Sequence, residues 1–382
     1  MLHLIITCDY EIFQTGTGDV MKCVIEPTQK LMEICNKYGA KLTIFFDVCE
    51  YLAFQEAEKK GLMNHLDYSP SEEITTQIKY ALSLGHDIQL HLHPHWIGAQ
   101  YKKNSWDLNY NLWRLPALSN QNSESITLDE IFNLGKKTLE DLLKPVVESY
   151  SCTAFRAGGY NIQPSKEILS TMKKLGFKSD SSVLPGFVLD KYSKYDFRTA
   201  PQDKNYWWVS NTVTRESSEK DILEMPIKTL NLPWSKFGRE NVREYFFGKS
   251  RTSPCGCYGK TFIDSQIVQS KRSRSLFDKI IARTYIRRMF HTLKLLLKSQ
   301  KEIFDYCHLS SGKMQYFVDN ALANDNHHKV NPLVMTGHSK SFNNTSNFEK
   351  FIKRMRYDYF DKDLLEFKTL SASINIIHDN EK

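Results

Sequence analysis

Short apolar runs alternate with amphipathic stretches along the chain. Compact apolar runs of about four to eight residues are typical of buried strands, whereas apolar residues at every third or fourth position are typical of helices. Several helical stretches are followed by glycine, which is favoured where a helix ends. We expect strands at residues 2–8, 41–48, 87–92, 152–155, 177–183, 221–225 and 332–336. We expect helices at residues 27–38, 69–84, 127–143, 164–175, 275–300 and 348–355.

This alternation of strands and helices predicts parallel β–α–β units. An open doubly wound sheet and a closed barrel share the pattern, so the pattern alone does not separate them. With 382 residues, the chain could hold two average domains or one large α/β barrel with insertions. We interpret residues 1–382 as one domain, interrupted by an insertion at about 232–304.

The insertion differs from the rest of the chain in its charge. Residues 236–301 hold sixteen Lys and Arg against four Asp and Glu, whereas the whole chain has a net charge of +7. The expected helix at 275–300 has an apolar stripe and a basic stripe. It could be a solvated helix that covers the barrel, or it could contact an anionic membrane surface or glycan. Nucleic acid is not expected as a partner, because no recognition motif accompanies the charge.

The N-terminus and the cysteines bear on where the protein works. The first apolar run is only residues 4–6, and Asp9 and Glu11 follow it, so we expect no signal peptide. No stretch approaches the roughly 20 apolar residues of a spanning helix. The eight cysteines show no repeated spacing, and the Cys255–Cys257 pair has no second pair to complete a zinc site. We therefore expect reduced thiols and a cytoplasmic protein, with peripheral membrane contact through the 275–300 helix as a further expectation.

Two acidic residues follow the first expected strand, Asp9 and Glu11. In parallel sheets and barrels, catalytic side chains gather at the carboxyl ends of the strands. Of two carboxylates at such an end, one can bind a metal while the other removes a proton from water. The alternative is that they are ordinary turn or helix-capping residues.

Four of the twelve histidines lie within ten positions, at 86, 91, 93 and 95. Imidazole is a common nitrogen ligand for zinc and similar ions, so this cluster indicates a metal site. If the strand continues, His91 and His93 share a face, because side chains alternate. If the chain turns at Pro94 into a helical turn, His91 and His95 converge instead. Proline suits such a turn, which favours His91 and His95.

Three later segments could complete a site. His338 follows the expected strand at 332–336 and could act as a general acid. Arg156 stands before a glycine turn and could hold a carboxylate by a bidentate contact, while the turn could point a backbone N–H at a developing oxyanion. Asp180 could orient Arg156. Surface ion pairs and turns are the simpler explanations of each.

Together these motifs resemble the polysaccharide deacetylase family, whose common core is the NodB homology domain. The order is similar: a carboxylate pair, a histidine cluster, an arginine, an aspartate and a late histidine. The strings His91-Leu92-His93-Pro94-His95-Trp96, Asp180-Ser181-Ser182-Val183-Leu184-Pro185 and Glu224-Met225-Pro226 look like a divergent branch associated with surface polysaccharide clusters. The likeness covers roughly residues 1–230 and 305–375 and leaves the basic insertion aside.

The resemblance implies a fold and a reaction. The fold would be an incomplete, distorted parallel (β/α) barrel of the polysaccharide deacetylase type, here with a basic helical insertion. The reaction would be metal-dependent removal of acetyl or other acyl groups from N-acylated sugars, by hydrolysis of linear C–N amide bonds in polysaccharide or glycoconjugate metabolism. One divalent metal is implied; zinc fits nitrogen and oxygen ligands, and iron, cobalt and nickel stay open.

The resemblance also implies roles for single residues. Asp9 would be the catalytic base, fixed by Arg156, and His338 would protonate the leaving amine. Asp180 would complete the catalytic set, while Tyr160 and Trp96 would lie on the oxyanion and substrate side. The metal ligands would be Glu11, His91 and His95, with His93 as the alternative ligand.

Two departures from the family pattern affect these assignments. Asp9-Tyr10 stands where many members have two adjacent aspartates, which moves the metal carboxylate to Glu11. Gly158 replaces a common proline. Two other functions are kept open: hydrolysis of a small non-glycan amide, and non-catalytic binding of glycan or membrane on the same scaffold.

Overall fold

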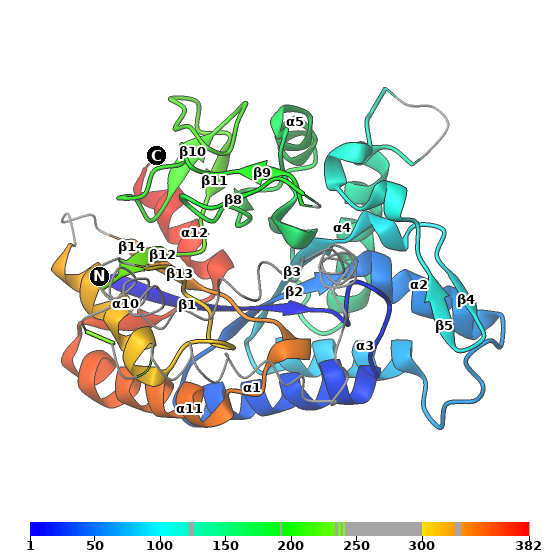
Figure 1. Cartoon of the computed structure of the whole chain (residues 1–382), viewed down its shortest axis with the longest axis horizontal. Coiled ribbons are helices and arrows are strands. Elements are labelled where there is room, and N and C mark those ends of the chain that lie inside the picture. Colours follow the sequence, from blue (N-terminus) through cyan, green and yellow to red (C-terminus); the bar gives the residue numbers. More distant parts are fainter. Residues whose placement is uncertain are drawn as a thin grey trace, which may run out of the picture.

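The computed structural model describes residues 1–121, 126–191, 193–233, 236–237, 240, 300–324 and 330–381. A nine-stranded sheet forms its centre, in the order β10–β11–β7–β6–β3–β2–β1–β14, with β15 also paired to β1 (Figure 1). Its strands are β1 (Leu2–Tyr10), β2 (Leu42–Asp47), β3 (Asp87–Leu92), β6 (Ala154–Ala157), β7 (Ser179–Asp180), β10 (Trp207–Val209), β11 (Ile222–Glu224), β14 (Asn331–Met335) and β15 (Leu365–Phe367).

The sheet is parallel except for its β10–β11 edge, and it curls back on itself. β1, β2, β3, β6, β7 and β11 pair in parallel, and β14 pairs in parallel with the other side of β1. Beyond β11, Ile227 forms a parallel bridge with Val334 of β14, and the Lys228 N–H donates to the Val334 carbonyl at 3.0 Å. The protein is therefore an incomplete α/β barrel, the fold that the resemblance implied, and the parallel β–α–β units are those that the alternation of elements predicted.

Helices cover the outer face of the barrel. They are α1 (Glu26–Lys37), α2 (Val48–Lys59), α3 (Pro70–Ser83), α4 (Leu128–Leu143), α5 (Lys166–Lys174), α10 (Ser311–Ala323), α11 (Thr345–Arg354) and α12 (Leu370–Asn380). α1 contacts α11, α3 contacts α2 and α4, and α4 contacts α5. Figure 1 shows α1, α3 and α11 along the lower side of the sheet. Several of these helices turn an apolar stripe to the strands, as Ile168, Leu169 and Met172 do in α5.

Smaller two-stranded sheets lie outside the central sheet. They pair β4 (Gln100–Lys102) with β5 (Ser105–Asp107), β8 (Val188–Leu189) with β9 (Tyr195–Asp196), and β12 (Thr229–Leu232) with β13 (Gln300–Ile303). β12 and β13 therefore bring together the two ends of the expected insertion. Most of the insertion, including nearly all of the helix expected at 275–300 and the Cys255–Cys257 pair, lies outside the described residues. The other six cysteines are buried, and they form no disulfide within the described part of the chain.

The strands and helices predicted within the described residues are confirmed with four corrections, whereas the helix predicted at 275–300 stays untested. β1 continues to Tyr10, so Asp9 belongs to the strand instead of following it. The strand expected at 177–183 is reduced to two residues, because its second half hydrogen-bonds to side chains at the site. α2 was missed because its buried residues do not follow a single stripe. α10 and α12 were also missed.

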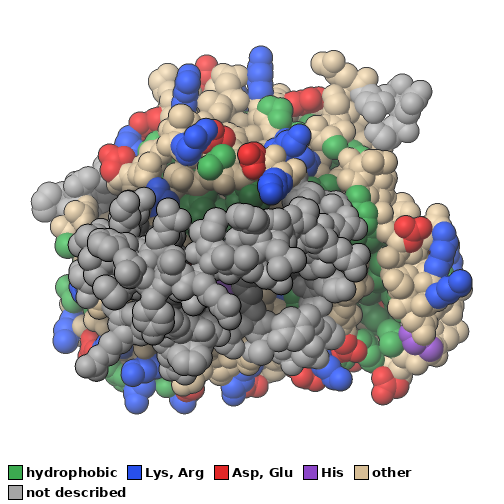
Figure 2. Space-filling view, in the orientation of Figure 1, with side chains coloured by type: hydrophobic (Ala, Val, Ile, Leu, Met, Phe, Trp, Pro, Cys, Tyr) green, Lys and Arg blue, Asp and Glu red, His purple; other side chains and the backbone are tan. Residues whose placement is uncertain are grey.

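The helices and one face of the surface can be described by their polarity. Within the described residues, no helix is both long and apolar enough to cross a bilayer. On the face shown in Figure 2, Lys and Arg side chains are intermixed with Asp and Glu side chains around its margin. That part of the surface therefore carries charge of both signs.

Candidate metal centre

The carboxyl ends of β1 and β3 bring Glu11, His91 and His93 together. One ligand atom from each of these three residues lies within 4.8 Å of the others. Glu11 Oε2 is 2.6 Å from His93 Nε2 and 3.5 Å from His91 Nε2. Each of the three residues is no more than 2% exposed. The structure thus gathers one carboxylate and two imidazoles in a buried position at the strand ends.

The hydrogen bonding of these imidazoles fits a metal ligand set. His91 Nδ1 lies 2.8 Å from the Arg156 carbonyl oxygen, which can only accept, so Nδ1 carries a proton and Nε2 is the ring nitrogen that faces Glu11. Although they lie near Glu11, the Nε2 atoms of His91 and His93 are buried without a well-directed hydrogen bond. Two imidazole nitrogens and one carboxylate oxygen are donors that zinc and similar divalent ions prefer.

Glu11 is held by a buried lysine that the sequence did not single out. Lys340 Nζ forms an ion pair with Glu11 Oε1 and donates to the Ile12 carbonyl at 3.1 Å. Burial alone would raise the pKa of Glu11, but His93 and Lys340 lower it well below its usual range. Glu11 is therefore ionised, with Oε1 occupied by Lys340 and Oε2 directed to the histidines.

Asp9 lies beside this group, between an arginine and a histidine. Its Oδ1 is 2.6 Å from Arg156 Nη1, and its Oδ2 is 3.5 Å from His338 Nε2. Burial would raise the pKa of Asp9, yet the charge of Arg156, followed by that of His338, lowers it overall. His338 Nε2 is also 3.9 Å from Glu11 Oε1, and its side chain is 23% exposed. Asp9 is thus an ionised, buried carboxylate whose second oxygen faces a histidine that solvent can reach.

Arg156 is completely buried, and several elements hold its guanidinium. Nε donates to the Ser181 carbonyl at 2.9 Å, and Nη2 contacts Ser181 Oγ at 3.0 Å. Nη1 also reaches Thr7 Oγ1 at 2.9 Å, and the group lies over the Phe45 ring at 4.1 Å. These contacts leave Arg156 one geometry, in which it holds Asp9.

Asp180 contributes to this arrangement through the backbone. Its two oxygens accept from Ser182 N at 3.1 Å and Ser182 Oγ at 2.7 Å, and Ser182 Oγ in turn accepts from the Ala157 N–H at 2.9 Å. From this segment the direct contacts to Arg156 come from Ser181, not from Asp180. Asp180 thus fixes the segment that holds the arginine.

His95 and Trp96 are not among the three gathered ligands, although the His95 ring is 5.1 Å from that of His93. β3 ends at Leu92, and residues Pro94–Trp96 form a short 3-10 turn, as the proline suggested. The turn places His95 Nε2 3.1 Å from the Gln14 carbonyl, with its ring 4.8 Å from that of Trp113. Trp96 is 3% exposed and packs against Trp106. The preferred trio of Glu11, His91 and His95 is therefore not assembled in the structure, whereas the alternative trio with His93 is.

The glycine turn after β6 lies directly against the histidines. A Cβ on Gly158 would lie 2.6 Å from His93 Nδ1, so only glycine leaves room for this ring. Gly159 and Tyr160 follow with φ of 57° and 60°, a left-handed pair that turns the chain sharply. The Tyr160 ring makes an edge contact with Tyr195. The turn thus borders the candidate metal position.

Two further acids at this edge of the sheet escaped the sequence analysis. Asp47 ends β2, and Glu50 lies in the first turn of α2, where both of its oxygens accept from the Ile12 N–H at 3.0 and 3.1 Å. Burial raises the pKa of Glu50 well above its usual value. The available signal was the position of Asp47 in the strand predicted at 41–48. For Lys340, the available signal was only its position two residues after His338.

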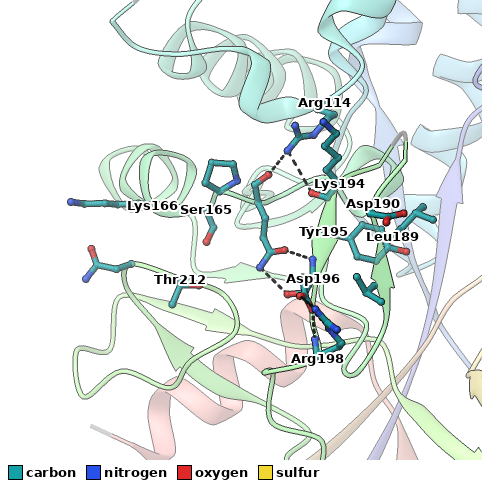
Figure 3. Close-up of a pocket in the computed structure, with 14 residues that line it drawn as sticks. Arg114, Ser165, Lys166, Leu189, Asp190, Lys194, Tyr195, Asp196, Arg198 and Thr212 are labelled. Atoms are coloured by element: carbon teal, nitrogen blue, oxygen red, sulfur yellow. Dashed lines mark hydrogen bonds and ion pairs between the residues drawn. The ribbon is translucent and has the colours of Figure 1, made fainter.

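A separate groove of about 940 Å³ opens between the start of α5 and the β8–β9 hairpin (Figure 3). Arg114 lines it and donates to the Gln163 carbonyl at 2.8 Å, and Asp196 pairs with Arg198 beside it. None of the three gathered ligands, nor Asp9 or His338, lines this groove. The groove is therefore separate from the buried group at the strand ends.

Comparisons with known proteins give remote structural likenesses. No protein-family model matches the chain, and a search of curated proteins finds no match. Among solved structures, a protein assigned as a polysaccharide deacetylase from Mycobacterium smegmatis aligns with 100% of this chain and 91% of its own, at 11% identity and a TM-score of 0.45. PuuE allantoinase aligns with 99% and 91%, at 10% identity and a TM-score of 0.41. A protein assigned as a polysaccharide deacetylase from Pseudomonas aeruginosa PAO1 aligns with 99% of this chain and 91% of its own. The sequence identity is 10% and the TM-score is 0.43.

Proposed function

We propose that the protein is a metal-dependent hydrolase that removes acetyl or other acyl groups from N-acylated sugars. The observation that carries the proposal is the buried group of Glu11, His91 and His93, set beside the ion-paired Asp9 and the accessible His338. A metal position, a proton acceptor and a proton donor side by side are the parts that amide hydrolysis requires.

We assign Glu11, His91 and His93 as the residues that hold the metal, with zinc as the first candidate. Three protein ligands with a further position open are typical of catalytic sites, whereas structural sites are closed by four. When bound, such an ion lowers the pKa of a bound water molecule and polarises the acyl oxygen. His95 is kept as a neighbouring residue that supports the His93 ring, because the two rings are 5.1 Å apart.

Asp9 would take the proton from the attacking water. Arg156 holds Oδ1 at 2.6 Å and lowers the pKa of the carboxyl against the effect of burial, so Oδ2 is ionised and available. The oxygen of the water forms a bond to the acyl carbon as its proton moves to Oδ2. The charge that then develops on the acyl oxygen requires donors, and the N–H groups of the turn at Tyr160 are the proposed source on the protein side.

His338 would deliver a proton to the departing nitrogen. Burial lowers the pKa of His338, partly opposed by Asp9, so the protonated ring releases its proton more readily than an exposed histidine does. Asp9 Oδ2 is 3.5 Å from Nε2 and is the nearest group from which the ring can receive a proton. The C–N bond then breaks as the nitrogen takes the proton, which makes the amine a good leaving group.

Deacylation assays on a substrate panel test this proposal. The panel should hold lipid-linked and nucleotide-linked N-acetyl amino sugars together with small linear and cyclic amides. We expect release of acetate from an amino sugar by the zinc-loaded protein, and none by its Asp9→Asn variant, which keeps the shape of the side chain. Turnover of only the small amides would exclude the glycan substrate, and turnover of nothing on the panel would favour a binding protein. The cytoplasmic location and the membrane contact of residues 275–300 stay predictions.

A further inference from the structure

The turn after β6 holds a backbone conformation that is costly for a tyrosine. Tyr160 has a φ of 60°, in the left-handed region, where a side chain crowds its own backbone. Gly159, with a φ of 57°, lies in the same region at little cost. A strained residue keeps its conformation only where the surrounding contacts fix it, and functional sites are where such residues gather. The contacts that fix this turn therefore bear on the backbone donors that we place there.

Asn161 closes the turn upon itself. It is 1% exposed, and both its backbone N–H and its side-chain Nδ2 donate to the Gly158 carbonyl, each at 3.2 Å. The next backbone N–H, that of Ile162, donates to the Tyr160 carbonyl at 3.0 Å. Asn161 Nδ2 also donates to Ser193 Oγ at 3.2 Å. One buried amide thus holds the start of the turn and links the turn to a segment about thirty residues further along the chain.

That segment is the β8–β9 hairpin, which contacts the turn region at two further places. Gln163 Nε2 donates to the Asp196 carbonyl at 3.1 Å, and the Asp196 N–H donates to Gln163 Oε1 at 2.6 Å, as the dashed lines beside Asp196 in Figure 3 mark. The Tyr160 ring meets the Tyr195 ring edge-on, with the ring centroids 6.4 Å apart. The hairpin therefore contacts both the strained residue and the segment that follows it.

Arg114 holds the turn region and the hairpin from outside. Its Nη2 donates to the Gln163 carbonyl at 2.8 Å and to the Lys194 carbonyl at 3.5 Å (Figure 3). A single guanidinium thus contacts the segment after the turn and the hairpin at once. With the bonds of Asn161 and Gln163, hydrogen bonds from three side chains join the two segments.

These contacts could serve the fold alone, but their position favours a role in the reaction. The carbonyl that Asn161 holds belongs to Gly158, where an added Cβ would lie 2.6 Å from His93 Nδ1. A shift of the turn would therefore move backbone that packs against a proposed metal ligand. It would also move the N–H groups proposed to face the acyl oxygen, whose effect depends on their exact placement.

We infer that Asn161 is a positioning residue for the reaction: supported by the β8–β9 hairpin through Ser193, it holds the Tyr160 turn in the conformation that presents its N–H groups to the acyl oxygen. The inference rests on the proposed function, because the turn has this task only in an amide hydrolase. It assigns neither Asn161 nor Ser193 a contact with the reacting atoms.

Two measurements on Asn161→Ala test this role. Hydrogen exchange with mass spectrometry follows the backbone amides of residues 158–163; we expect exchange about tenfold faster there and unchanged in β1 and β2, because only the turn opens more often. Steady-state assays with excess zinc follow an N-acetyl amino sugar that the wild type hydrolyses. We expect kcat to fall about 10–100-fold with KM little changed, because misplaced donors weaken an interaction made in the transition state.

Ser193→Ala is the second variant, for the case that Asn161→Ala does not fold. It removes the partner in the hairpin and keeps the bonds within the turn, so we expect the same two changes at smaller size. Asn120→Ala is the matched control. Asn120 Nδ2 likewise donates to two acceptors, Asp129 Oδ1 at 2.9 Å and Thr171 Oγ1 at 3.0 Å, but these lie on the outer helices α4 and α5. We expect wild-type exchange at the turn and wild-type kcat in this control.

The outcomes separate this inference from the proposed function. Wild-type exchange at residues 158–163 in the folded variants shows that Asn161 does not hold the turn. Faster exchange with a wild-type kcat shows that Asn161 serves the fold alone, and either result overturns its positioning role. A wild type that releases acetate from no amino sugar overturns the proposed function and the positioning role with it, while the exchange data still decide whether the hairpin holds the turn.

Discussion

Removal of the Arg156 guanidinium should destabilise the protein mainly through Asp9. In Arg156→Met, the ion pair of 2.6 Å is lost and Asp9, 2% exposed, keeps a buried charge. The hydroxyls beside it keep their own partners, because Thr7 donates to Met335 O and Ser181 to Met225 O. The uncompensated carboxylate is thus the principal cost, about 3–5 kcal/mol for breaking one side of a buried pair.

The contribution of Asp9 to the pH dependence of the free energy of unfolding should also change its sign. In the wild type the pKa of Asp9 lies below its usual value, so its contribution to stability is present at neutral pH and is lost as the pH falls through the folded-state pKa. Without Arg156, burial is the largest remaining effect and raises that pKa. The folded variant then binds the proton more readily than the unfolded chain does. Its loss of unfolding free energy relative to the wild type should therefore shrink from pH 7 to pH 5.

Urea unfolding of the metal-free proteins measures both effects. The set is wild type, Arg156→Met, Asp9→Asn and the double variant, with chelator present so that metal binding does not add to stability. We expect the double variant to be more stable than the sum of the two single losses predicts, by about 1–3 kcal/mol, because the orphaned charge is gone. Additivity within about 0.5 kcal/mol, or a deficit that grows at pH 5, would refute this description of the pair.

Three further predictions concern single residues. His338→Ala should slow amide hydrolysis by about 10²–10⁴-fold but spare an activated aryl ester, whose leaving group needs no proton; equal losses on both substrates in steady-state assays would count against the role. Burial, followed by the charge of Lys41, lowers the pKa of His86 from 6.5 to about 4. Between pH 4 and pH 6.5, His86 is protonated only in the unfolded chain, so the free energy of unfolding should fall by up to about 3 kcal/mol from pH 6.5 to 4. His86→Gln should flatten this pH dependence in urea unfolding. Gly158→Ala should push on His93 and weaken zinc binding about tenfold or more in a titration, whereas unchanged affinity would show that the ring can move freely.

The sequence predicted the elements that carry strong periodicity. The run at 87–92 and the capped stretch at 127–143 became β3 and α4, because a buried strand and an amphipathic helix each leave their period in the chain. α2 left no such mark: its buried positions include Glu50, and it begins directly at the end of β2. The only signal for the start of α2 was Asp47. Because Asp47 is also the last residue of β2, it could be taken for the end of the strand alone.

The candidate site likewise contains residues that the sequence could predict and a choice that it could not. Asp9, Glu11, Arg156 and His338 could be picked out because each stands near the end of a predicted strand, and parallel strands bring their ends together. The choice between His93 and His95 depends on the 3-10 turn at Pro94–Trp96, where a few backbone angles decide which ring faces Glu11. A turn was foreseeable from Pro94. The direction of the turn could not be foreseen. It places His95 near the Gln14 carbonyl, a contact between residues distant in the chain that no local pattern encodes.

The metal content of the purified protein and of its single-site variants tests the central claim most directly. We predict about one divalent ion per chain in the wild type by elemental analysis, its loss in Glu11→Gln, His91→Ala and His93→Ala, and its retention in His95→Ala. Retention in His93→Ala with loss in His95→Ala would show that the other trio binds the ion. A wild type that is free of metal and still deacylates amino sugars at its full rate would contradict the metal-dependent mechanism as a whole.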